Sequence, residues 1–237
     1  VKTEEELQRI SMASNIADRA LAHVEPLLVS ALSQGISERD IRDELELMMR
    51  RFGADGPSYE TIVASGPNSA LPHHRPTTSL LREGHSVVID VGALVDGYHS
   101  DMTRTYLLGD CDPELVRMHQ LVIEAQSSGL NAVRAGVPAN EVDGVCREVF
   151  DRHGFGHEFS HGTGHGVGLQ IHEMPWLRRN AKDPLTSGEV VTVEPGLYRG
   201  GVGGVRIEDL VVVTGNTCRI LTLTPKDLTC PRSPQTI

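Results

Sequence analysis

The chain has 237 residues, of which 39% are hydrophobic, 23% charged and only 4% aromatic, and its formal net charge is −10. This length suits one large domain or two small ones with an aliphatic core, and the acidic balance argues against a nucleic-acid or anionic-membrane surface. The four cysteines form no CxxC pair, so we expect free thiols in a reducing cytosol. The charged start VKTEEELQRI is no signal peptide, and no apolar run reaches the length of a membrane span.

The first predicted element is a helix over residues 3–33. Its apolar residues recur at helical spacing, and Thr3 with Glu6 three positions later has the pattern of a capping box. Pro26 is expected to kink this helix or to end its first part. A second helix is predicted from Ser37 to about Arg51, with its apolar positions facing the core.

Strands follow the helices. The short β-branched runs ETIVAS, SVVIDVG and MTRTYLLG are bounded by Gly, Pro and Asn, which predicts strands. GPNSALPHHRPT, between the first two, is rich in turn-forming residues and is predicted to be a loop. Two further helices are expected over 112–135 and 140–153, followed by the strands EVVTVEPG, GVRIEDLVVVT and CRILTL and a frayed end, PRSPQTI. The mixture favours an α+β fold over a regularly alternating α/β fold.

Four acids and one histidine stand in short glycine-flanked contexts: Asp90, Asp101, His165, Glu194 and Glu208. A carboxylate at the end of a buried strand must be paired, metal-bound or protonated. A short hairpin would bring Asp90 and Asp101 together; the alternative is that such acids form salt bridges or cap turns. For Glu208 the alternative is an ion pair with Arg206, which lies two residues earlier on the same face of a predicted strand.

Three histidines, His161, His165 and His172, occur within HGTGHGVGLQIH. Their offsets of four and seven residues would place them on one helical face, but four interspersed glycines favour a loop leading into a strand. Three histidines in so short a segment favour a functional site over three structural side chains.

The charges of this set favour metal. Four carboxylates and a neutral imidazole sum to −4, which two divalent cations would neutralise. Ligands that are mostly hard oxygens suit Mn²⁺, Co²⁺ or Zn²⁺. Two such ions can share a water molecule, lower its pKa and polarise a carbonyl group.

Together, VIDVG, SDMTRT, HGTGHGVGL, VEPGLY and VRIED resemble the creatinase/prolidase/methionine aminopeptidase superfamily over nearly the whole chain. The resemblance implies the pita-bread fold, a curved and mostly antiparallel sheet flanked by helices, with residues 1–237 as a single catalytic domain. It also implies that Asp90 chelates one metal, that His165 and Glu194 hold the other, and that Asp101 and Glu208 bridge both.

Two motifs look most like those of the proline peptidases, Xaa-Pro dipeptidase (prolidase) and Xaa-Pro aminopeptidase. GPNSALPHH resembles their substrate-histidine loop, with His73 as the matching residue, and VRIED resembles their last ligand motif. Such proteins usually carry an additional N-terminal domain, often involved in dimerisation. This chain starts at what resembles the first helix of the catalytic domain, so we expect either that the N-terminal domain was removed or that this is a short variant. A homodimer is one assembly that the resemblance allows. Length alone favours the alternative of a methionine aminopeptidase, and a non-catalytic pita-bread binding module is an alternative of another class.

The expected reaction is hydrolysis of the Xaa-Pro bond at the N-terminus of dipeptides or short peptides. Glu194 would act as general base and then acid, while His161 and His172 would donate to the oxyanion. His73 would orient the substrate or relay a proton. Arg206 would hold the terminal carboxylate of a dipeptide or brace Glu208.

Trp176, the single tryptophan, stands in MPWLRR just after His172. In a loop beside the site it would wall the entrance, with Arg178 or Arg179 attracting a carboxylate. The alternative is a partly exposed hydrophobic staple.

Overall fold

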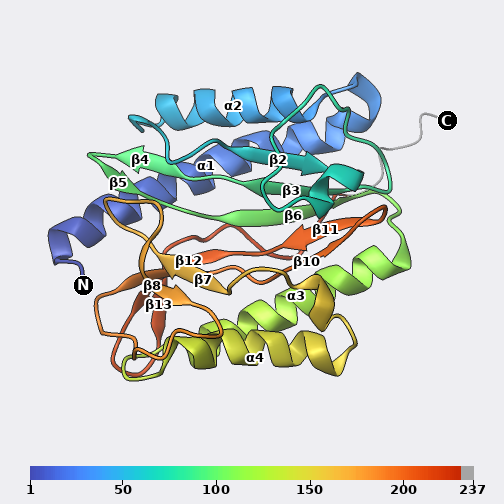
Figure 1. Ribbon diagram of the computed structural model, residues 1–237. Coiled ribbons are helices and arrows are strands. Elements are labelled where there is room, and N and C mark those ends of the chain that lie inside the picture. Colours follow the sequence, from blue (N-terminus) through green and yellow to red (C-terminus); the bar gives the residue numbers. More distant parts are fainter. Residues whose placement is uncertain (231–237) are drawn as a thin grey trace.

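The computed structural model describes residues 1–230 and shows the expected α+β fold, with helices on both sides of the strands (Figure 1). One helix pair lies along the strands of the N-terminal half, and the other lies along those of the C-terminal half. The four helices are α1 (Glu4–Gln34), α2 (Glu38–Arg51), α3 (Pro113–Ala132) and α4 (Ala139–Arg152). The predicted frayed end, residues 231–237, lies outside the described residues.

Two larger sheets carry most of the strands. The first has the order β14-β6-β3-β2, in which β14 joins β6 in parallel and the other pairs are antiparallel. Its strands are β2 (Ile62–Ser65), β3 (Ser86–Asp90), β6 (Thr103–Leu108) and β14 (Leu228–Cys230). The second, antiparallel throughout, has the order β13-β12-β9-β7-β8. Its strands are β7 (Gly164–Gly166), β8 (Glu173–Leu177), β9 (Val190–Val193), β12 (Asp209–Val213) and β13 (Cys218–Ile220).

Smaller elements connect these sheets. A two-stranded ribbon and a three-stranded sheet, with the order β1-β4-β5, complete the strands, and two 3-10 helices lie in the connections. The ribbon consists of β10 (Gly196–Arg199) and β11 (Gly203–Arg206). The three-stranded sheet consists of β1 (Gly56–Pro57), β4 (Ala93–Val95) and β5 (Tyr98–His99). The 3-10 helices are η1 (Gly66–Ala70) and η2 (Gly156–Glu158).

Local sequence signals account for the N-terminal helices. Helix α1 begins at the predicted capping box of Thr3 and Glu6, and α2 begins at a second box that Ser37 forms with Asp40. Pro26 lies inside α1, which continues through it rather than ending there.

The two helix pairs bury separate apolar clusters. Helices α1 and α2 pack against β2, β3 and β6, while α3 and α4 pack against β9 to β12. Covering the strands on their helical side leaves the strand ends free to carry polar side chains between the halves. No helix within residues 1–230 combines the length and the apolar character needed to cross a membrane.

The structure corrects three local predictions. GVRIEDLVVVT is not one strand, because β11 ends at Arg206 and β12 starts at Asp209 in another sheet. Arg206 and Glu208 therefore do not share a strand face, and Arg206 pairs instead with Asp90. The predicted loop GPNSALPHHRPT opens with the 3-10 helix η1, and Trp176 lies in strand β8 rather than in a loop.

Candidate active site

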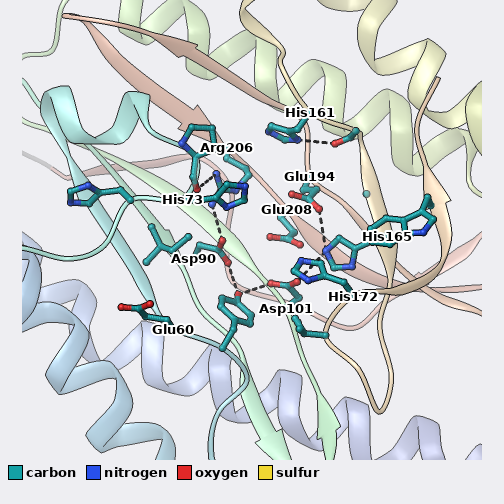
Figure 2. A pocket seen from close by; sticks show the side chains of 18 of the residues that line it. Glu60, His73, Asp90, Asp101, His161, His165, His172, Glu194, Arg206 and Glu208 are labelled. Atoms are coloured by element: carbon teal, nitrogen blue, oxygen red, sulfur yellow. Dashed lines mark hydrogen bonds and ion pairs between the residues drawn. The ribbon is translucent and has the colours of Figure 1, made fainter. Parts of the chain in front are cut away.

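A cavity of about 570 Å³ gathers side chains from both halves of the chain (Figure 2). All nine residues predicted to take part in catalysis, substrate binding or metal binding line this cavity. They are His73, Asp90, Asp101, His161, His165, His172, Glu194, Arg206 and Glu208. The polar faces of both sheets thus meet at one place.

Asp90 and Asp101 reach this cavity through a hairpin, as predicted. Asp90 is the last residue of β3, the β4–β5 hairpin follows, and Asp101 lies just before β6, which returns alongside β3. The Tyr59 hydroxyl lies between the two acids, within hydrogen-bond distance of Asp90 Oδ1 and, at 2.5 Å, of Asp101 Oδ1, and its single hydrogen is donated to one of these oxygens at a time. Burial raises the pKa of Tyr59 well above its usual value, and the charges of Asp101 and Asp90 add to this, so Tyr59 stays a hydrogen donor.

His165 in β7 faces two carboxylates. Its Nδ1 lies 3.0 Å from the Gly166 carbonyl oxygen, a contact that needs the proton on Nδ1 and leaves a lone pair on Nε2. That Nε2 lies 3.3 Å from Glu194 Oε1 and 3.5 Å from Asp101 Oδ2. Both carboxylates therefore face the Nε2 lone pair of His165, and all three atoms are of the kinds that bind divalent cations.

Glu208 completes the group. Asp101, His165 and Glu208 offer ligand atoms that all lie within 4.8 Å of one another. Thr103 Oγ1 donates to Glu208 Oε2 over 2.7 Å, whereas the buried Oε1 has no hydrogen-bond partner among the described residues. A divalent cation would supply the missing partner, so this hard-oxygen donor set fits such an ion.

The metal-free carboxylates carry the electrostatic signature of a cation site. Burial raises the pKa of Glu208 well above its usual value, and the charges of Asp101 and Glu194 raise it further. The pKa of Asp101 is raised well above its usual value for the same reason, with Asp90 and Glu194 as the neighbouring charges. Bound cations would offset both the burial and the repulsion.

Arg206 braces the neighbouring acid. Its guanidinium donates to Asp90 Oδ2 over 2.7 Å, to Thr103 Oγ1 over 3.0 Å and to the Tyr198 hydroxyl over 2.8 Å. Of its two predicted roles, bracing a ligand agrees with these contacts, but the acid that it contacts is Asp90. Thr103 links Arg206 indirectly to Glu208.

His161 is held by both ring nitrogens. Its Nδ1 lies 2.8 Å from the Gly162 carbonyl oxygen, so Nδ1 donates there and Nε2 accepts from the Tyr198 hydroxyl, also over 2.8 Å. Burial lowers the pKa of His161, which keeps the ring neutral as this pattern requires. Donation from His161 to a substrate would require release of one of these contacts.

His172 stands next to the ligands. Its ring centroid lies 4.4 Å from that of His165 and 6.4 Å from that of Trp176, with which it stacks at 21°. Burial lowers its pKa, and the neighbouring His165 lowers it further. No hydrogen bond within residues 1–230 engages the His172 ring. Trp176 lines the cavity, and the Arg178 guanidinium carbon lies 5.5 Å from the Trp176 ring centroid.

The sequence profile of metallopeptidase family M24 matches residues 8–215, most of the chain. This chain belongs to metallopeptidase family M24. It is 40% identical to the Xaa-Pro dipeptidase of Pyrococcus furiosus over 228 residues, 96% of this chain and 64% of that protein. The chain thus spans less than two thirds of the length of this curated relative.

Solved structures agree with this family assignment. The Xaa-Pro dipeptidase from Bacillus anthracis superposes with a TM-score of 0.92 at 41% identity, covering 97% of this chain and 63% of that one. The X-Pro aminopeptidase from Thermotoga maritima superposes with a TM-score of 0.91 at 39% identity, covering 97% of this chain and 64% of that one. These likenesses confirm the pita-bread fold, and M24 membership implies divalent-metal binding.

Sequence reasoning missed three polar residues of this M24 site: Tyr59, Thr103 and Tyr198. Thr103 lies two residues after Asp101, and Tyr198 lies four residues after Glu194, so their closeness to predicted ligands was an available signal. Tyr59 offers no such signal, because only the fold places it between Asp90 and Asp101.

Proposed function

We propose that this chain carries the catalytic domain of a metal-dependent exopeptidase that hydrolyses the Xaa-Pro bond at the N-terminus of dipeptides or short peptides. The observation that carries the proposal is the meeting of the five predicted ligands with His73 and His172 in one cavity. The relatives named as Xaa-Pro dipeptidase and X-Pro aminopeptidase support the choice of substrate over the methionine aminopeptidase alternative.

The proposed cofactor is a pair of divalent cations, Mn²⁺ first, with Co²⁺ or Zn²⁺ as alternatives. Asp90, Asp101, His165, Glu194 and Glu208 would hold the ions. When bound, the ions would acidify a water molecule and polarise the scissile carbonyl group. The unpartnered Glu208 Oε1 and the Nε2 lone pair of His165 support this donor set.

Protein side chains would handle the protons. Thr192 Oγ1 donates to Glu194 Oε1 over 3.1 Å and thereby orients this carboxylate next to His165. Glu194 would accept a proton from the attacking water and return it to the leaving proline nitrogen. A neutral His172 would donate its ring N–H to the carbonyl oxygen as negative charge develops there.

The other predicted residues would shape the site. His73 would orient the substrate from the loop on the opposite side (Figure 2). Tyr198 and Gly162 occupy both ring nitrogens of His161. We therefore assign His161 the role of positioning Tyr198, which in turn contacts Arg206, rather than a direct contact with the substrate. The same reasoning makes Arg206 a brace for Asp90 rather than a holder of the substrate carboxylate.

The thiols support a reducing compartment, and we propose the cytosol. Cys111, Cys146 and Cys218 are free; the side chain of Cys230 lies outside the described part. Burial raises the pKa of Cys146 to about 12, which keeps this thiol unreactive.

A substrate comparison on the purified, Mn²⁺-loaded chain tests the function. Ala-Pro and Ala-Pro-Xaa peptides are expected to be cleaved at least about a hundredfold faster than Met-Gly peptides. This ratio corresponds to a difference of about 3 kcal/mol in activation free energy between a substrate that fits the site and one that does not. Metal analysis of the saturated protein is expected to give two ions per chain. Preference for Met-Gly, or fewer than two ions, would refute the corresponding part of the proposal.

Glu194→Gln tests the assigned base. The amide keeps the shape of the side chain but cannot take up the proton, so kcat is expected to fall by about 10² to 10⁴. Metal content is measured in parallel, and the comparison is made on protein that retains both ions. Glu189→Gln is the control, since Glu189 directly precedes β9, as Glu194 directly follows it, accepts a hydrogen bond from Thr186 N and does not line the cavity. Wild-type turnover of a two-metal Glu194→Gln protein would exclude the base role.

A further inference from the structure

Glu38 is a fully buried carboxylate outside the set of predicted ligands. It is the first residue of α2, and its exposure is 0%. Oε1 accepts from Ser65 N over 2.8 Å and from Asn68 Nδ2 over 2.9 Å. Oε2 accepts from His74 Nε2 over 2.9 Å, from Thr77 N over 3.0 Å and from Thr77 Oγ1 over 2.8 Å. One carboxylate thus collects five hydrogen bonds from a single segment of the chain.

This cluster keeps Glu38 ionised. Burial alone raises its pKa, but the hydrogen bonds from Asn68, His74 and Thr77 outweigh burial and hold the pKa below its usual value. The position at the start of α2 also favours a negative charge. Such a charge binds its donors more strongly than a neutral acceptor would.

Four of the five donors belong to one segment, which we name the His73 loop and define as residues 66–79; the fifth, Ser65 N, lies at the end of β2 directly before it. The backbone N–H groups of Glu38 and Arg39 donate to the Ser79 and Thr77 carbonyl oxygens, each over 3.0 Å. The first turn of α2 therefore holds the His73 loop through hydrogen bonds made by both the Glu38 side chain and the backbone.

The inner side of the same loop faces the cavity. Pro72, His73 and His74 line the cavity, and the hydrogen bond that the Pro72 carbonyl accepts from Arg206 Nη1 is long, at 3.4 Å. Within residues 1–230 no hydrogen bond engages the His73 ring itself. Of the two residues next to His73, His74 is held by the shorter hydrogen bond, which its ring donates to Glu38.

We propose that Glu38 is a positioning residue, which fixes His73 at the wall of the cavity by clamping the His73 loop from outside. A loop that is already ordered does not lose conformational freedom when a substrate binds, so the clamp raises substrate affinity. The kinetic part of this inference rests on the proposed peptidase function; the structural part does not.

Glu38→Gln is the decisive variant. Its amide nitrogen cannot accept hydrogen bonds, so in either orientation at least two of the five donors lose their partner. Glu44→Gln is the matched control: it makes the same change in α2 at a carboxylate that also contacts a histidine Nε2, that of His23 over 3.1 Å, but it lies outside the clamp.

Amide hydrogen exchange of the metal-free chain reads out the clamp without reference to activity. Glu38→Gln is expected to speed exchange across residues 66–79 about tenfold or more, and Glu44→Gln is expected to leave it unchanged. Unchanged protection of this segment in folded Glu38→Gln would overturn the proposal. If Glu38→Gln does not fold, Thr77→Val replaces it, since this change removes one hydroxyl donor at nearly constant volume.

Steady-state kinetics with Xaa-Pro dipeptides read out the consequence for the site. Glu38→Gln is expected to raise KM about tenfold with kcat within about threefold, and to add nothing in a His73→Ala background. Equal losses in both backgrounds, or a loss of bound metal, would mean that Glu38 does not act through His73. If the wild-type chain cleaves no Xaa-Pro peptide, the proposed function fails, while the exchange experiment still decides the clamp.

Discussion

Glu208→Gln is expected to lower peptidase activity at least about a thousandfold, which corresponds to about 4 kcal/mol in the activation barrier. The variant removes a charged oxygen atom from the centre of the ligand group and leaves a neutral amide that binds divalent cations poorly. Activity and metal content together measure the effect. Glu189→Gln again serves as the control.

The same variant is expected to stabilise the metal-free protein. The pKa values of Asp101 and Glu208 are raised in the folded chain, so the contribution of these two groups to metal-free stability is fully present below the usual carboxyl pKa and is lost as pH rises through the folded values. At pH 7 a neutral amide in place of the Glu208 carboxylate removes part of that loss. Thermal melting with EDTA should show a higher midpoint than wild type, and added Mn²⁺ should raise it less. A lower metal-free midpoint together with wild-type stabilisation by Mn²⁺ would contradict the assignment of Glu208 as a ligand.

Arg104→Leu is expected to lower the free energy of unfolding by about 3–5 kcal/mol. Arg104 is fully buried in β6, and its Nη2 donates to Asp209 Oδ1 over 2.8 Å. It also donates to the carbonyl oxygens of Thr103 and Thr224, each over 2.9 Å, and to that of Glu208. Loss of these donors leaves buried acceptors unpaired directly behind a predicted metal ligand.

Urea unfolding with and without Mn²⁺ measures this effect. Arg152→Leu is the control, because Arg152 and its partner Glu124 form an exposed ion pair at 3.5 Å, for which a loss below about 1 kcal/mol is expected. In the double variant Arg104→Leu/Asp209→Asn, the loss should be smaller than the sum of the single losses, because Arg104 and Asp209 contact each other directly, and Asp209 also pairs with Lys226. A loss below about 1 kcal/mol for Arg104→Leu would show that this network adds little to stability.

Much of the fold could be predicted from local signals. The capping boxes at Thr3 and Ser37 lie within four residues of sequence, so both N-termini were predicted correctly. The strand break after Arg206 was missed, because the apolar residues before and after it continue one strand-like pattern, while β11 and β12 join different sheets. Strand partners are long-range contacts, which a local pattern does not specify.

The candidate site divides in the same way. By itself the sequence indicated nine of the residues that line the cavity, because a carboxylate such as Asp90 at the end of an apolar run, or a histidine such as His165 among glycines, is conspicuous locally. The tertiary structure alone decided their partners. Arg206 binds Asp90 rather than the nearby Glu208, and Tyr59 joins two acids more than thirty positions away. Buried polar groups take whichever partners the packed chain brings within hydrogen-bond distance, and that choice depends on the whole fold.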